Sequence, residues 1–207
     1  MHKQSISALD YLSLGEKYLR AAHELSAGIV RNKNRSAVLT KTKLSLAQVD
    51  NRTRWSDTNL GVPLLFNFFH GIELTLKGQM VCAGQDKVKG HKLTVLLSQW
   101  VANSENTALR KLINQWLLPK SNSPLFHFLT DNDVTIDEWY ESLKYPEVNN
   151  QKPISHFKLK YGGQGSISFW LKLKTDSTEI RRLSVAIYIN AKNAQHVAAI
   201  HNIPAHF

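Results

Sequence analysis

The chain has 207 residues, a length that suits one ordinary domain or a domain with an appendage. Its hydrophobic fraction of 43% and charged fraction of 20% lie near globular averages, which excludes a wholly disordered chain. The single cysteine, Cys82, excludes an internal disulfide framework, and no apolar run approaches the roughly 18 to 20 residues of a membrane span. Because the N-terminus also lacks a signal-peptide pattern, these features predict a cytoplasmic protein.

The net charge of +10 is unevenly distributed along the chain. Residues 1 to 120 hold 17 Lys and Arg against 8 Asp and Glu, whereas residues 121 to 207 hold 9 against 8. Clustered cations gain free energy when they displace counterions from a polyanion, so the basic part of the chain favours contact with nucleic acid. A charge that serves solubility alone is the alternative.

The first predicted element is a long helix over residues 7 to 31, where apolar residues recur at three- and four-residue spacing after a capping serine. Residues 31 to 54 then hold seven Lys and Arg against one acid, Asp50. This segment predicts either a solvated linker, as a loop or with a short helix near residues 44 to 49, or an arm that contacts phosphates. The arm interpretation assigns RNA or nucleotide binding to the segment's basic residues and to two later lysines. These residues are Arg31, Lys33, Arg35, Lys41, Lys43, Arg52, Arg54, Lys77 and Lys89.

A second helix is predicted to open near Pro63 and to end at Gly84. Its wide apolar surface is typical of the central helix of a bundle. Shorter helices are predicted to follow, the last of them opened by the capping box TIDE at residues 135 to 138. They occupy residues 93–101, 104–118, 124–129 and 139–143.

The pattern changes after residue 150. The stretches SHFKLKYG (155–162) and SISFWLKLKT (166–175) alternate apolar and polar positions around GGQG, which predicts a β-hairpin. A second capping box at 176–179 and helical spacing thereafter favour a final helix, with a strand over 183–189 as the alternative. The predicted fold is therefore mainly α: a helical domain over residues 1–150, and a hairpin with a C-terminal helix over 151–207 packed on the same domain.

His70, Glu73 and Lys77 stand at i, i+3 and i+7, and so share one face of the second predicted helix. Such a set in a low-dielectric groove could act in acid–base chemistry. The alternative is structural, with Glu73 and Lys77 forming an ion pair at the favourable i, i+4 spacing. No HExxH motif, Cys/His cluster or glycine-rich phosphate loop is present, so neither a metal nor a cofactor is predicted.

Four stretches, taken in order, resemble a HEPN domain, a helical superfamily found in prokaryotic toxins, defence systems and nucleotidyltransferase partners. They are ALDYLSLGEKYLRAAHEL, PLLFNFFHGIELTLKGQM, KGHKLTVLL and YESLKYPE, and the resemblance covers about residues 8 to 148. It implies an antiparallel helical bundle that forms a homodimer and binds RNA or a nucleotide. It also implies a nucleotidyltransferase or an antitoxin of a toxin–antitoxin system as the partner protein.

In the ribonucleases of this superfamily an arginine is followed by four to six intervening residues and then by a histidine. His91 matches that histidine by position, but Gly84, Gln85 and Asp86 stand where the arginine would be. Lys87 lies closer and lacks the bidentate guanidinium.

The resemblance therefore favours a non-catalytic module that binds RNA, a nucleotide or a partner protein. One alternative is a variant metal-independent ribonuclease that uses His91 with Lys87 or Lys89, assisted by Glu73. The other is a helical scaffold in which the His91 imidazole bonds to Glu73 or to a backbone carbonyl.

Overall fold

The computed structural model describes residues 6–85, 88–102, 107–118, 120–145 and 166–201. These residues form α-helices and loops, and the prediction of a mainly α fold is confirmed for them. The helices are α1 (Ala8–Arg31), α2 (Leu46–Thr53), α3 (Asp57–Cys82), α4 (Leu93–Val101), α5 (Thr107–Leu117), α6 (Phe126–Asn132), α7 (Ile136–Ser142) and α8 (Ser166–His201).

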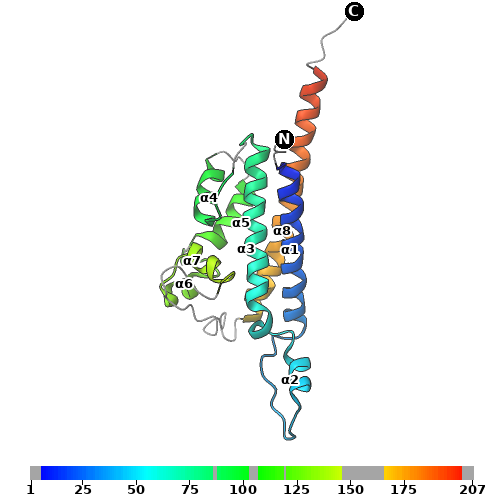
Figure 1. Cartoon of the computed structure of the whole chain (residues 1–207), viewed down its shortest axis with the longest axis vertical. Coiled ribbons are helices and arrows are strands. Elements are labelled where there is room, and N and C mark those ends of the chain that lie inside the picture. Colours follow the sequence, from blue (N-terminus) through cyan, green and yellow to red (C-terminus); the bar gives the residue numbers. More distant parts are fainter. Residues whose placement is uncertain (1–5, 86–87, 103–106, 119, 146–165, 202–207) are drawn as a thin grey trace, which may run out of the picture.

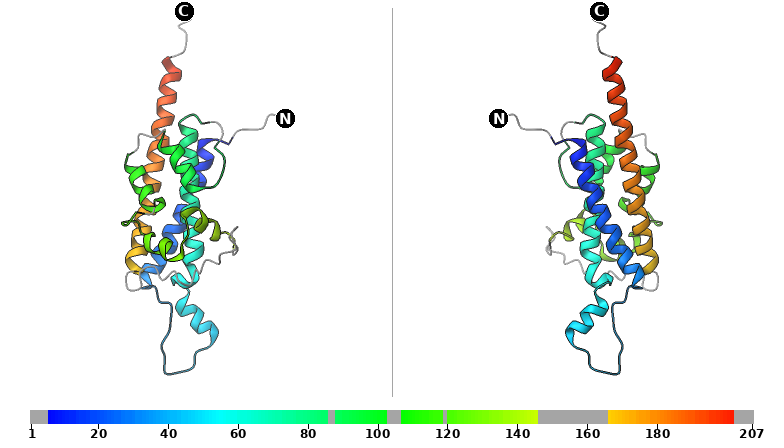
Figure 2. Two further views of the ribbon diagram at one scale, coloured as in Figure 1. Left: turned by 90° about the vertical axis from the view of Figure 1, so that its left-hand side faces the viewer. Right: turned by 90° about the vertical axis from the view of Figure 1, so that its right-hand side faces the viewer.

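Three long helices, α1, α3 and α8, run side by side and form the spine of the bundle (Figure 1). The shorter helices α4 to α7 cover another side of α3, so that α3 lies in the middle. The α2 segment projects beyond one end of the spine, as the two side views show (Figure 2). None of the helices in the described part of the chain combines the length and the apolar character needed to span a bilayer.

Capping residues account for several helix starts. Ser7 accepts a hydrogen bond from the Asp10 N–H at the start of α1, and Thr135 accepts one from the Glu138 N–H at the start of α7. In both cases the third residue's carboxylate bonds back to the cap, which confirms both predictions of a helix start. Ser45 forms a third capping box and opens α2, so the short-helix alternative for the basic segment is correct.

Helix α3 is the predicted central helix, and every residue from Gly71 to Met80 is buried. Its predicted start was wrong, because α3 begins at Asp57 and Pro63 lies inside it. A tertiary contact sets the true start: the Asn34 side chain accepts the Asp57 N–H at 2.7 Å and donates to the Asp57 carboxylate at 2.7 Å. Pro63 is exposed and has no backbone N–H, so α3 lacks one backbone hydrogen bond at this position.

Glycines allow α1 and α3 to approach each other closely. A Cβ added at Gly71 would lie 2.6 Å from Leu19 Cγ, and one at Gly78 would lie 2.6 Å from Leu12 Cγ. A Cβ at Gly15 of α1 would lie 3.2 Å from the Gly71 carbonyl oxygen. The two helices therefore pack with leucines of α1 over glycines of α3, a contact that larger residues would hold apart.

The second strand of the predicted hairpin is wrong, because residues 166–175 form the first turns of α8. Alternation suggested a strand, yet Leu171 is 47% exposed while Phe169, Trp170 and Leu173 are buried. Burial at 169/170, 173, 176/177 and 180 has the period of a helix that packs on α1 and α3. The predicted first strand, 155–162, lies outside the described residues.

The same helix settles two other predictions. The capping box expected at 176–179 lies in the interior of α8 and starts no helix, so that prediction is also wrong. Residues 183–189 are helical, which confirms the final helix over its strand alternative.

Substitution at the α1–α3 contact tests this packing. Gly71→Ala should lower the free energy of unfolding by about 1–3 kcal/mol, because its methyl group must displace Leu19. The matched control is Gly61→Ala on the same helix, where an added Cβ would meet Asp57 and Trp170 at ordinary distances of 3.8 and 3.9 Å. That control should keep its stability or gain up to about 1 kcal/mol from helix propensity. Urea denaturation followed by circular dichroism compares them, and equal stability of the two variants would contradict the close contact.

Candidate functional site

The carboxylate of Glu73 is the centre of a polar cluster inside the bundle. Glu73 is 1% exposed and accepts hydrogen bonds from Lys77 Nζ and from His91 Nδ1, each 2.8 Å from Oε1. The Tyr140 hydroxyl donates to Oε2, also at 2.8 Å. Lys77 comes from α3, His91 from the loop before α4, and Tyr140 from α7. One carboxylate therefore ties three parts of the chain together.

A second layer of contacts surrounds Tyr140. Its hydroxyl proton is used by Glu73, so the oxygen accepts from His70 Nδ1 at 2.9 Å. The His70 ring is enclosed by Tyr18, edge-on at 4.5 Å between ring centroids, and by Phe66, stacked at 5.3 Å. His70 is thus a packing and hydrogen-bonding residue of the core.

Lys144 lies at the edge of the cluster. Its Nζ is 3.9 Å from Glu73 Oε2 and 3.9 Å from the centroid of the Tyr140 ring. It adds a second lysine to the surroundings of the carboxylate and a cation–π contact to the tyrosine.

The cluster keeps Glu73 ionised and Tyr140 protonated. Burial on its own would raise the pKa of Glu73, but the contacts with His70, Lys77 and Tyr140, together with the charge of Lys77, hold that pKa far below its usual value. Burial and the neighbouring charge of Glu73 raise the pKa of Tyr140. Glu73 therefore carries a full negative charge at neutral pH, and Tyr140 remains a hydrogen-bond donor.

His91 is the member of the cluster that faces solvent, with 72% of its side chain exposed. Its bond to the ionised Glu73 places a proton on Nδ1, so in the neutral imidazole Nε2 carries the lone pair. Nε2 makes no hydrogen bond to any residue that the structure describes. A carboxylate–imidazole pair of this kind can accept or deliver a proton at Nε2.

The structure brings together some of the predicted site residues and separates others. The ion pair between Glu73 and Lys77 is confirmed. Lys77 is consequently buried against Glu73 and lies away from any surface open to RNA. Lys89 is exposed in the loop before His91, whereas Lys87 lies outside the described residues.

The seven basic residues of the segment 31–54 are all exposed, and the segment extends from the end of the bundle where α3 begins. Glu73 lies in the second half of α3, so this segment and the polar cluster are separate features. Trp55, at the base of the segment, packs on Gly28 of α1, where an added Cβ would come within 2.2 Å of the indole ring. Its ring therefore serves to attach the segment to α1.

Two residues of the cluster, Tyr140 and Lys144, were missed as site residues in the sequence. A signal existed, because both stand in YESLKYPE, one of the four stretches that carry the HEPN resemblance. Lys144 follows Tyr140 by four residues and lies just beyond the end of α7 at Ser142. The long-range partner, Glu73 on another helix, was the part that spacing could not indicate.

Within the described residues, no group of three His, Cys, Asp or Glu side chains is arranged to hold a metal ion. Comparisons of this chain with protein-family models, with curated proteins and with solved structures each find no match.

The charge of Glu73 makes the stability of the fold depend on pH. Folding lowers the pKa of Glu73, so its carboxylate stabilises the folded state at pH values above its unfolded-state pKa of about 4.3. That stabilisation is lost progressively as the pH falls below about 4.3. Glu73→Gln should lower the free energy of unfolding at pH 7 by about 3 kcal/mol, because Lys77 is left as an uncompensated buried charge.

Urea denaturation at pH 7, 5 and 3 measures this effect. The difference in free energy of unfolding between wild type and Glu73→Gln should be largest at pH 7 and smaller at pH 3. Glu24→Gln replaces an exposed carboxylate of α1 and should change stability by less than about 0.5 kcal/mol at every pH. A deficit of Glu73→Gln that stays constant from pH 7 to pH 3 would show that the charge of Glu73 is not what stabilises the cluster.

Proposed function

We propose that this chain is a HEPN-like, non-catalytic RNA-binding module, and that residues 31–54, here called the basic arm, contact the phosphate backbone. One observation carries the proposal: the basic arm projects from the bundle (Figure 1), and its seven Lys and Arg residues are all exposed. None of these seven side chains forms an ion pair with a described residue, and Asp50 is the one acid among them. A dense row of cations without counter-charges is the electrostatic pattern of a phosphate-binding surface.

The size of the electrostatic effect follows from the number of cations. Each phosphate contact with single-stranded RNA contributes about −0.7 to the slope of log K against log salt concentration. Seven contacts would give a slope of about −5, so binding would weaken steeply between 50 and 200 mM salt. Non-specific contacts of this kind position the strand without selecting its sequence.

The end of α3 supports the non-catalytic part of the proposal. Gly84 has a φ of +88° and closes α3, with its N–H bonded to the Val81 carbonyl and the Gln85 N–H bonded to the Met80 carbonyl. This is the glycine-terminated helix end in which a side chain would strain the backbone. One of the positions at which a ribonuclease of the superfamily would carry arginine is therefore occupied by a residue needed for the turn.

Charge removal in the basic arm tests RNA binding. Lys41→Gln/Lys43→Gln should weaken binding of a single-stranded RNA about tenfold at 100 mM salt and reduce the salt slope by about 1.4. Both lysines are exposed, so the fold should be unaffected. Fluorescence anisotropy over a range of salt concentrations measures both quantities.

The matched control, Lys17→Gln/Lys192→Gln, removes the same charge from exposed sites on α1 and α8. It should change the affinity less than threefold. Equal weakening by the two double variants would mean that net charge, and not the basic arm, accounts for the binding. Absence of any binding by the wild type would refute the proposal.

A second candidate function, a variant metal-independent ribonuclease, is favoured by the Glu73–His91 pair. The imidazole is held at 2.8 Å by an ionised carboxylate and presents Nε2 to solvent, as a general base for a 2′-OH would require. Lys144 adds a positive charge 3.9 Å from the other carboxylate oxygen of Glu73. Among the described residues that contact Glu73 there is no arginine, so no guanidinium is present beside the pair to bind a phosphate through two hydrogen bonds.

Cleavage assays separate the two candidates. We expect wild type and His91→Ala to bind RNA with the same affinity and neither to shorten it, with or without EDTA. Cleavage by the wild type that persists in EDTA and disappears in His91→Ala would instead assign the ribonuclease activity. Lys92→Ala, at the neighbouring exposed position, is the control for local loss of structure.

A further inference from the structure

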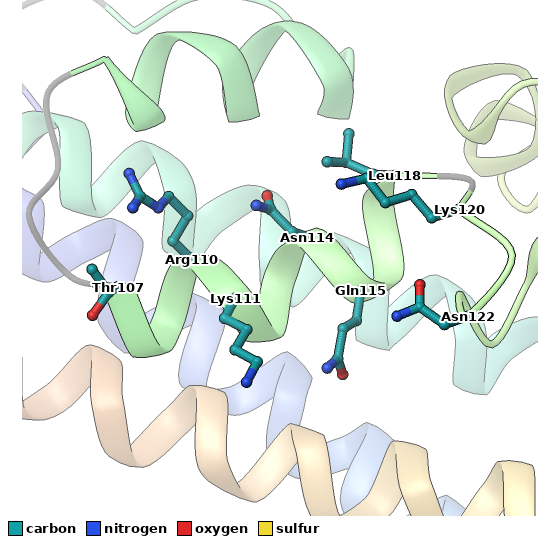
Figure 3. Close-up of a pocket in the computed structure, with 8 residues that line it drawn as sticks. All are labelled: Thr107, Arg110, Lys111, Asn114, Gln115, Leu118, Lys120 and Asn122. Atoms are coloured by element: carbon teal, nitrogen blue, oxygen red, sulfur yellow. The ribbon is translucent and has the colours of Figure 1, made fainter.

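A polar groove lies along α5 (Figure 3), and none of its lining residues belongs to the basic arm or to the Glu73 cluster. Its volume is about 310 Å³, near the lower end of the range of roughly 300–1,000 Å³ for small-molecule sites. Its lining recurs at three- and four-residue spacing along α5 and continues into the turn that follows. The lining residues are Thr107, Arg110, Lys111, Asn114, Gln115, Leu118, Lys120 and Asn122.

The groove is positively charged. Arg110, Lys111 and Lys120 line it, and its described lining contains no carboxylate. Arg110 is partly buried and forms no ion pair with any residue that the structure describes. The neighbouring carboxylate of Asp176 is already engaged, since it accepts from Trp116 Nε1 at 2.7 Å and from Lys172 Nζ at 2.8 Å. Among the residues that the structure describes, the three cations of the groove therefore meet no counter-charge, which favours an anionic ligand.

Two amide side chains give the groove further hydrogen-bonding capacity. Lys172 Nζ donates to Gln115 Oε1 at 3.1 Å, which orients this amide and leaves its NH₂ group as a donor. Asn114 Oδ1 is buried and has no hydrogen-bond partner among the residues that the structure describes. A buried acceptor without a partner is costly, so a ligand that donates a hydrogen bond to Asn114 would recover free energy.

The lining also indicates what the uncharged part of the ligand is. Leu118 is the one apolar side chain in the described lining, and no aromatic ring is present there on which a nucleobase could stack. Amide and hydroxyl side chains, here Asn114, Asn122 and Thr107, suit a ligand rich in hydroxyl groups.

We propose that this groove binds a sugar phosphate, with the phosphate attracted by the positive charge of Arg110, Lys111 and Lys120 and a sugar hydroxyl donating to Asn114. The ligand class combines the two properties that the groove demands, a compact anion and several hydrogen-bond donors. The site is independent of RNA binding by the basic arm, so either proposal can hold without the other.

Isothermal titration calorimetry with ribose 5-phosphate, inorganic phosphate, ribose and adenosine 5′-monophosphate tests the proposal on the full chain. Ribose 5-phosphate should bind saturably, about fivefold more tightly than inorganic phosphate, because only the former reaches Asn114. Ribose should show no binding. No saturable binding of ribose 5-phosphate would overturn the proposal. Tighter binding of the nucleotide, or equal binding of inorganic phosphate, would overturn the assignment to sugar phosphates.

Variants locate the binding site. Arg110→Gln and, separately, Lys111→Gln should each weaken ribose 5-phosphate binding about tenfold or more. Asn114→Ala should remove the preference for ribose 5-phosphate over inorganic phosphate without lowering the melting temperature, because the buried oxygen has no partner to lose. Lys17→Gln, at an exposed site on α1, should bind ribose 5-phosphate as the wild type does. Unchanged affinity in both Arg110→Gln and Lys111→Gln would place the ligand elsewhere and refute this site.

Discussion

The buried carboxylate of Glu73 is the constraint on which the arrangement of the bundle depends. A charge in a low-dielectric interior is tolerated only when hydrogen bonds and an opposite charge compensate it. Lys77, Tyr140 and His91 meet that demand from three separate elements. The approach of α7 and of the loop before α4 to α3 is thus dictated by electrostatics as well as by apolar packing.

The close contact between α1 and α3 also brings side chains of α1 within reach of this cluster. Leu12 and Leu19 lie over glycines of α3, so no side chain of α3 holds the two helices apart at these positions. At that separation Tyr18 of α1 reaches the ring of His70, which in turn bonds to Tyr140. Small residues on one helix therefore position aromatic and polar residues that complete the surroundings of Glu73.

The polar cluster also limits what chemistry the interior can perform. Most of its members donate to or accept from one another, and among the described residues of the cluster His91 has the most exposed side chain, at 72%. The positive charge that is free to meet a ligand lies elsewhere, in the basic arm and in the groove along α5. This separation agrees with the two proposals that the protein binds anions at its surface. The ion pairs and hydrogen bonds of the Glu73 cluster stabilise the core.

Sequence alone determined the helical character of the chain, the helix starts marked by Ser7 and Thr135, the central place of α3 and the ion pair between Glu73 and Lys77. These features depend on local spacing and capping, which act over a few residues. The start of α3 at Asp57 and the helix over 166–175 were decided by contacts far along the chain, with Asn34 in one case and with α1 and α3 in the other.

Only the tertiary structure brought Tyr140 to Glu73 and decided that His91 bonds to Glu73 and not to a backbone carbonyl. It also left Asn114 Oδ1 without a partner among the described residues and separated Lys77 from the basic arm. The physical reason is that the cost of burying a charge or an amide depends on which elements close around it. That information is carried by the packing of helices and not by the order of residues within any one of them.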